Sequence, residues 1–193
     1  MRLILASASP RRAEILHNAN IGFEVRTALV DESRRAAESP ADYVRRLALE
    51  KASAAMNAKK DDGDCLYLGA DTIVLADGEV LGKPESDEEA RMMLRRLSGA
   101  VHEVHTGVAL LRRPVPAERV IVETTRVHFA QLSEEDIDSY LASGEPFDKA
   151  GAYAIQGIAG RYIDRIEGCY FNVVGLPLAR IWSLMRELGW EQS

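Results

Sequence analysis

Two adjacent arginines lie where a helix is predicted to begin. Ser9 suits the residue that caps a helix and Pro10 suits its first position, which places Arg11 and Arg12 in the first turn. Free backbone N–H groups make that end of a helix partly positive, so two cations there favour a bound anion. Guanidinium groups grip phosphate oxygens in a bidentate fork, and the segment therefore predicts phosphate binding. The alternative is that Ser9 only caps the helix and that the arginines are solvated.

A lysine lies in the apolar stripe of the next predicted helix. Ser39-Pro40 is a second cap-plus-proline start, and the spacing predicts a helix over residues 40–58 with Val44 and Leu47 on its buried side. Lys51 falls in the same stripe. It needs a partner or a ligand there, unless its ammonium group reaches solvent at the edge of the stripe.

An aspartate follows a strongly apolar segment. Residues 65–70 are predicted to form a core strand that delivers Asp71 and Thr72, and a hairpin turn then leads to Lys83 within Gly-Lys-Pro. An unpaired buried carboxylate is costly, so packing alone explains Asp71 poorly, although a turn-forming role is an alternative. Together with the two arginines and Lys51, these residues indicate a polyphosphate site.

Common phosphate loops and zinc sites are absent from the sequence. Neither G-x-x-x-x-G-K-[ST] nor G-x-G-x-x-G occurs. His102 and His105 lie three residues apart in a predicted strand, so their side chains face opposite sides and cannot share a metal ion. Cys65 and Cys169 form no Cys-x-x-Cys pair, and we do not expect a zinc enzyme.

Composition narrows the class of protein. The chain has 193 residues, of which 47% are hydrophobic and 28% charged, as expected for a globular domain. Its net charge of −6 disfavours broad affinity for nucleic acid or anionic lipid. No export signal or membrane span is predicted, and two cysteines are too few for a disulfide framework. We therefore expect a cytoplasmic protein with neither a nucleic-acid nor a membrane partner.

Further elements must position the charged residues. Ser86 and Glu89 predict a capping box for a helix that ends near Leu97. The other expected elements are strands at 2–6, 23–27, 101–111, 119–129, 162–166 and 171–174, helices from 10 towards 17, from 133 to 144 and over 177–188, and a glycine-rich passage over 148–157.

Five segments carry a family resemblance. They are Ser7-Ala8-Ser9-Pro10-Arg11-Arg12, Leu49-Glu50-Lys51-Ala52, Gly69-Ala70-Asp71-Thr72, Gly82-Lys83-Pro84, and Asp148-Lys149-Ala150-Gly151 with Ile155-Gln156-Gly157. The order of these segments is that of the Maf proteins, which the chain resembles from residue 3 to about residue 180. The resemblance implies an α/β protein of the Maf/ITPase-like fold. In that fold a long twisted mixed sheet is flanked by helices, and a single domain, here residues 1–193, has two lobes around a deep cleft.

The resemblance also implies an activity, the hydrolysis of a nucleoside triphosphate to the monophosphate and pyrophosphate. Ala70-Asp71-Thr72 and Gln156 are similar to the subgroup that acts on dTTP and UTP. The subgroup that acts on 7-methyl-GTP carries Ser-Asp-Gln at the first of these places. By the same resemblance, Arg11, Thr72 and Gln156 influence the choice of base.

A mechanism follows as a hypothesis. A triphosphate carries about four negative charges, so cationic side chains and Mg²⁺ or Mn²⁺ must neutralise it. Glu32 and Asp71 are the candidate metal anchors, and Asp71 either orients the attacking water or takes its proton. The predicted catalytic residues are Glu32, Lys51, Asp71 and Lys83, and the predicted substrate-binding residues are Ser9, Arg11, Arg12, Thr72, Lys149 and Gln156.

Two other functions stay open at this point. One is a nucleotide-sensing regulator of cell division or septum formation without significant turnover. The other is a nucleic-acid-binding module, which the net acidity and the lack of aromatic residues among the basic ones disfavour. A homodimer is the general expectation for a chain that self-associates.

Overall fold

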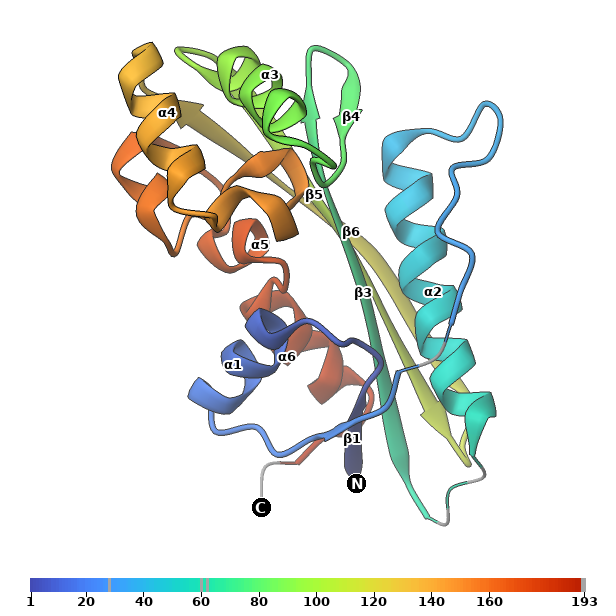
Figure 1. The fold of residues 1–193 in the computed structure, drawn as a ribbon. Helices are drawn as coiled ribbons and strands as arrows, with labels where there is room; N and C mark the ends of the chain where they lie inside the picture. The colour runs from blue at the N-terminus through green and yellow to red at the C-terminus, as the bar shows by residue number, and fades with distance from the viewer. Residues whose placement is uncertain (28, 60, 62, 192–193) are drawn as a thin grey trace. The chain divides into compact units, whose positions relative to one another are not determined.

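The computed structural model describes residues 1–27, 29–59, 61 and 63–191. Within them the chain forms a seven-stranded mixed sheet with helices packed beside it (Figure 1). The strand order is β2-β1-β3-β5-β6-β7, and β4 pairs with β3. In chain order the elements are β1 (Arg2–Leu5), α1 (Pro10–Asn18), β2 (Glu24–Val25), α2 (Pro40–Ala58), β3 (Cys65–Ala76), β4 (Glu79–Leu81), α3 (Asp87–Leu97), β5 (Val101–Arg113), β6 (Ala117–Phe129), α4 (Glu134–Ala142), the 3-10 helices η1 (Glu145–Asp148), η2 (Ala150–Ala152) and η3 (Ile158–Tyr162), β7 (Ile163–Glu167), α5 (Tyr170–Val174) and α6 (Leu178–Glu187).

The chain divides into two compact units. Unit 1 comprises residues 1–71, 106–123 and 175–193, and unit 2 comprises residues 72–105 and 124–174. Strands β3, β5 and β6 each contribute residues to both units. The boundary in β3 falls between Asp71 and Thr72, so the predicted site residues are distributed over both units.

Parallel pairing in unit 1 places two of the predicted segments side by side. Strand β1 pairs in parallel with β3, with Leu5 opposite Leu68, and the Ala6 N–H donates to the Leu68 carbonyl at 2.8 Å. The chain after β1 therefore emerges beside the stretch of β3 that leads to Asp71. This register brings the turn into α1 close to the aspartate.

Helix α2 packs closely against the sheet within unit 1. The predicted helix over residues 40–58 is confirmed, and its cap Ser39 accepts a hydrogen bond from the Asp42 N–H at 3.1 Å. A Cβ at Gly69 would lie 2.1 Å from the Ala48 carbonyl oxygen, and one at Gly107 would lie 2.1 Å from that of Val44. Only glycine allows so close an approach. Figure 1 shows α2 on one side of the unit 1 strands and α1 and α6 on the other.

Unit 2 has its own hydrophobic core. Helices α3 and α4 pack against each other, and their apolar sides join Val104 and Phe129 of the sheet in one buried cluster. The predicted hairpin at Asp77-Gly78 joins β3 to β4, with φ of 50° and 79° at the two turn residues. Both residues adopt the left-handed conformation that two-residue hairpin loops require. Among the described residues, no helix is long and apolar enough to cross a bilayer.

The prediction of a strand at 171–174 is wrong, because this segment forms helix α5. The N–H groups of Asn172 and Val173 donate to the Cys169 carbonyl. The Asn172 amide donates in turn to the Val104 carbonyl and to Thr125 Oγ1, each at 3.0 Å. These contacts with distant residues outweigh the β propensity of Phe-Asn-Val-Val, a context effect that such propensities do not capture.

Two local predictions also need correction. Asp71 does not end its strand, because β3 continues to Ala76 and Asp71 lies inside it, which excludes the turn-forming alternative. Ser86 caps α3 as predicted, but the Glu89 carboxylate accepts from the Glu85 N–H at 2.7 Å. The Glu89 carboxylate thus binds the N–H of the residue before the N-cap, whereas in a capping box it would bind the N–H of the N-cap itself.

Candidate active site

Lys51 joins two carboxylates in unit 1. Its Nζ lies 2.7 Å from Asp71 Oδ1 and 2.7 Å from Glu32 Oε1. The Lys51 and Asp71 side chains are only 14% and 13% exposed, whereas Glu32 is 61% exposed. The expectation that Lys51 has a partner is confirmed, and its ammonium group does not reach out to solvent. Helix α2, strand β3 and the loop before α2 thus meet at one charged cluster.

Burial dominates the electrostatics of Asp71. Desolvation raises the pKa of its carboxyl above the usual value, and the neighbouring Lys51 and then Arg12 lower it without cancelling the rise. Glu32 adds a smaller upward contribution to the same pKa. A carboxylate with a raised pKa is a better proton acceptor than an ordinary aspartate, as a general base requires.

The loop that carries Glu32 is tied to α2 by side chains that sequence analysis did not single out. The Tyr43 hydroxyl donates to the Glu32 carbonyl at 2.6 Å, and Arg46 Nη2 donates to the Ser33 carbonyl at 3.0 Å. Arg46 also forms an ion pair with Glu38 at 2.7 Å, which holds the pKa of Glu38 well below its usual value, at about 2. Tyr43 and Arg46 lie three residues apart, and this spacing places them on one face of α2. That spacing is the sequence signal that could have indicated their contact with the Glu32 loop.

Arg12 is buried and bound by protein groups. Its Nε donates to the Gly175 carbonyl at 2.8 Å, and its Nη1 donates to Ser7 Oγ at 3.0 Å and to the Ala70 carbonyl at 2.9 Å. Burial lowers the pKa of the guanidinium, while the charge of Asp71 opposes this effect. Arg12 therefore ties the turn after β1 to the residue just before Asp71, and the solvated alternative is wrong for it.

The start of α1 differs from the expectation. Ser9 occupies the N-cap position, but its side chain caps none of the described N–H groups of α1. Instead, the Ser9 N–H donates to Ser7 Oγ at 3.2 Å. Arg11 lies half-buried in the first turn, and that turn contains no acidic residue. The first turn of α1 therefore supplies no carboxylate of its own to the positive end of the helix.

Two lysines of unit 2 lie on segments that hydrogen-bond to each other. The Gly151 N–H donates to the Gly82 carbonyl at 2.9 Å, which joins the segment of Lys149 to that of Lys83. Gly151 has φ 70°, and a Cβ there would lie 3.0 Å from the Val74 side chain. Lys83 is exposed, whereas Lys149 is half-buried, donates to the Glu145 carbonyl at 2.8 Å and pairs with the Asp148 carboxylate.

Gln156 lies exposed in a turn of unit 2 that is closed by the Gly157 N–H donating to the Ala154 carbonyl at 3.1 Å. Thr72, the first unit 2 residue of β3, is half-buried directly after Asp71. Sequence analysis did not single out Glu145, although its carboxylate accepts from the Ile158 N–H at 2.9 Å beside this turn.

Comparison with known proteins places the chain in a family. The family model described as Maf-like protein matches residues 2–188. The chain belongs to the Maf-like family. It is similar to a protein of Hahella chejuensis named dTTP/UTP pyrophosphatase, at 52% identity over 97% of this chain and 92% of that protein. It is also similar to a protein of the same name from Koribacter versatilis, at 51% identity over 98% of this chain and 95% of that one.

The predicted α/β class, with a mixed sheet and flanking helices, is confirmed for this Maf-like chain. The solved structure of the Staphylococcus aureus Ham1 protein matches with a TM-score of 0.52 over 97% of this chain and 100% of that one. Its sequence identity is 13%, so the likeness concerns the fold alone.

Glu32 and Asp71 carry the kind of oxygen donor that a hard divalent cation prefers. Glu32 and Asp71 both direct carboxylate oxygens at one point, the position of the Lys51 ammonium. Mg²⁺ is usually held by one or two carboxylates together with substrate phosphates, which is the number of carboxylates found here. Within the described residues, no group of three or more His, Cys, Asp and Glu side chains is placed to hold a metal ion.

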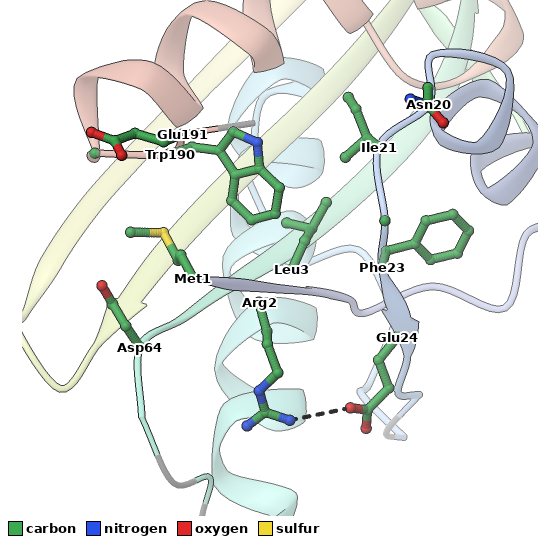
Figure 2. A pocket seen from close by; sticks show the side chains of 12 residues that line it. Met1, Arg2, Leu3, Asn20, Ile21, Phe23, Glu24, Asp64, Trp190 and Glu191 are labelled. Atoms are coloured by element: carbon green, nitrogen blue, oxygen red, sulfur yellow. Dashed lines mark ion pairs between the residues drawn. The ribbon is translucent and has the colours of Figure 1, made fainter. Parts of the chain in front are cut away.

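A pocket of about 820 Å³ in unit 1 lies apart from these residues (Figure 2). It surrounds the beginning of β1, with Phe23 and Trp190 among its lining residues and Arg2 paired to Glu24 at its edge. None of the ten predicted site residues is among the described residues that line it. Because Arg12 and Asp71 lie beyond the opposite end of β1, this pocket is not the predicted site.

Proposed function

We propose that this Maf-like chain is a nucleoside triphosphate pyrophosphatase that hydrolyses dTTP and UTP to the monophosphate and pyrophosphate. The observation that carries the proposal is the buried Asp71 carboxylate, held at 2.7 Å by Lys51 and raised in pKa by its burial. The names of relatives at 52% and 51% identity support the choice of substrate.

In the proposed reaction, water attacks the α-phosphorus and the bond to the bridging oxygen of pyrophosphate breaks. Asp71 orients that water or takes its proton, two roles that a carboxylate serves from the same position. Lys51 keeps the Asp71 carboxylate in place from α2. Arg11, Arg12, Lys83 and Lys149 are proposed to neutralise the phosphates, since the transition state and the leaving group gather negative charge.

Glu32 and Asp71 would hold Mg²⁺ or Mn²⁺ together with phosphate oxygens. The ion would supply positive charge that polarises the phosphoryl group. Lys51 lies between the two carboxylates, so it limits their mutual repulsion before substrate binds.

Choice of base is proposed to rest on Arg11, Thr72 and Gln156. Gln156 is exposed in its turn, and an amide offers both a donor and an acceptor to a pyrimidine edge. Ser9 is proposed to contact substrate at the start of α1, where its side chain is not used to cap the described N–H groups of the helix. A homodimer remains a prediction, which light scattering of the purified protein would test.

The deciding experiment is a panel of canonical and modified triphosphates, assayed with and without Mg²⁺ or Mn²⁺. We expect dTTP and UTP to give monophosphate and pyrophosphate in sustained turnover. Orthophosphate as the first product would mean that a different bond is cleaved. Stoichiometric binding without turnover would instead support a nucleotide-sensing regulator.

A further inference from the structure

The turn that carries Gln156 is held on both sides by one pair of side chains in unit 2. We call residues 154–159 the Gln156 turn. Before Gln156, the Ala154 N–H donates to the Tyr140 hydroxyl at 3.3 Å. After it, the Ile158 N–H donates to Glu145 Oε2 at 2.9 Å and the Ala159 N–H donates to Glu145 Oε1 at 3.4 Å.

The two side chains also bind each other. The Tyr140 hydroxyl donates to Glu145 Oε1 at 2.8 Å, so a single connected network reaches both ends of the turn. Tyr140 is fully buried in the core of unit 2 and stacks edge-on against Tyr162 at 6.0 Å between ring centroids. Burial, and next the contact with Glu145, raise the pKa of Tyr140, so its hydroxyl keeps the proton that it donates.

The glycine at position 157 leaves the space that the Glu145 carboxylate occupies. A Cβ at Gly157 would lie 2.2 Å from Glu145 Oε2 and 2.4 Å from Oε1, so any side chain there would displace the carboxylate. Burial raises the pKa of Glu145, but the N–H donors and Tyr140 outweigh this effect and the net pKa is lowered. Glu145 is therefore ionised at neutral pH, and its charge strengthens the hydrogen bonds that it accepts.

The same residue reaches a second predicted site residue. Lys149 Nζ donates to the backbone carbonyl of Glu145 at 2.8 Å. The backbone of η1 and the Glu145 carboxylate thus place Lys149 and the Gln156 turn relative to each other within one unit.

We propose that Glu145, supported by Tyr140, is a positioning residue that sets the Gln156 turn for base selection. The inference rests on the proposed function, since it assigns to Glu145 the placement of a side chain that selects the base. Glu145 acts through Gln156 and is not itself a contact of the nucleotide.

The test compares kcat/KM for UTP with kcat/KM for GTP in the unchanged protein and in four variants. Glu145→Gln keeps the size of the side chain but loses its charge and one acceptor oxygen. We expect the UTP/GTP ratio to fall roughly 10-fold or more, because small misplacements of a binding group have large effects. Gln156→Ala should lower the ratio similarly, and the double variant Glu145→Gln/Gln156→Ala should lower it no further. The control Glu135→Gln makes the same chemical change at an exposed position of α4 and should leave the ratio unchanged.

A general loss of folded protein would lower both kcat/KM values equally and leave their ratio intact. Hydrogen exchange of residues 154–159 is measured without nucleotide on the same proteins and on an added Tyr140→Phe variant. It should be faster in Glu145→Gln and in Tyr140→Phe than in the Glu135→Gln control. Faster exchange with an unchanged ratio, or additive effects in the double variant, would overturn the inference. Failure of the unchanged protein to release pyrophosphate from UTP would instead contradict the proposed function.

Discussion

At the scale of single residues, Asp71 combines two features that act on its pKa in opposite directions. It contacts an ammonium group at 2.7 Å, yet its pKa is raised because burial outweighs that contact. An ionised carboxylate in this position costs stability at neutral pH. Such a cost is typical of residues that serve chemistry, which supports the role proposed for Asp71.

Asp71→Asn is expected to lower turnover about 100- to 10,000-fold, the range for loss of a general base. The fold should be retained. Because the pKa of Asp71 is higher in the folded than in the unfolded state, its protonated form stabilises the fold. This stabilisation is fully present below the unfolded-state pKa and is lost as pH rises through the folded-state pKa. The neutral amide keeps that stabilisation at pH 7, so thermal unfolding at this pH should show a midpoint equal to or above that of the unchanged protein. Turnover close to the unchanged value would remove Asp71 from the mechanism.

Lys51→Met should shift the pH dependence of the remaining activity. The Lys51 charge lowers the pKa of Asp71, so its loss raises that pKa further above the usual 3.8. Because the ionised carboxylate is the proposed active form, the acid limb of the kcat/KM profile should move to higher pH. A profile with lower activity but an unchanged acid limb would show that Lys51 does not act through Asp71.

At the scale of elements, the distance between α2 and β3 determines whether Lys51 reaches Asp71. The helix approaches the strand where a Cβ at Gly69 would lie 2.1 Å from the Ala48 carbonyl oxygen and 2.7 Å from the Ala52 N. Both are backbone atoms of α2, the first lying three residues before Lys51 and the second directly after it. A single methyl group at position 69 would therefore displace the segment that carries the lysine.

Gly69→Ala is expected to lower the free energy of unfolding by about 1–3 kcal/mol, the usual cost of overpacking a well-packed interior. Activity should fall with it. Urea denaturation measures the first effect and pyrophosphate release the second. Gly22→Ala is the matched control, since a Cβ there meets no atom within 4 Å among the described residues. Equal destabilisation by both substitutions would contradict the close contact of α2 with β3.

At the scale of the whole molecule, charge is distributed unevenly. The net charge is −6, so a triphosphate meets an acidic protein unless cations gather locally. In unit 1, Arg12 and Lys51 both act on Asp71, and Arg11 is next to Arg12 in the chain. In unit 2, Lys83 and Lys149 lie on joined segments. A divalent cation would add to this positive charge and offset the carboxylates of Glu32 and Asp71.

Removal of divalent cations by EDTA is therefore expected to abolish pyrophosphate release from UTP. Addition of excess Mg²⁺ or Mn²⁺ should restore it, because both ions prefer the oxygen ligands that carboxylates and phosphates provide. Turnover that persists in EDTA would contradict the proposed role of Glu32 and Asp71 as metal ligands.

Much of the local structure and the family was predictable from the sequence. The bounds of α2, the cap at Ser39 and the Asp77-Gly78 hairpin were predicted because each depends on a few adjacent residues. The motif segments identified the Maf-like family for the same reason, since short runs of residues carry them. The sequence also predicted that Lys51 needs a partner or a ligand, although it left open that the ammonium group reaches solvent.

Only the tertiary structure decided which partners meet. Three of the contacts described above join residues that are well separated in the chain. Lys51 and Asp71 are 20 positions apart, Arg12 and Gly175 are 163 apart, and Glu145 and Ile158 are 13 apart. Segment 171–174 became a helix because its hydrogen bonds go to Val104 and Thr125, far along the chain. Such contacts depend on strand register and helix placement. The local sequence pattern specifies neither strand register nor helix placement, because both depend on the free energy of the whole folded chain.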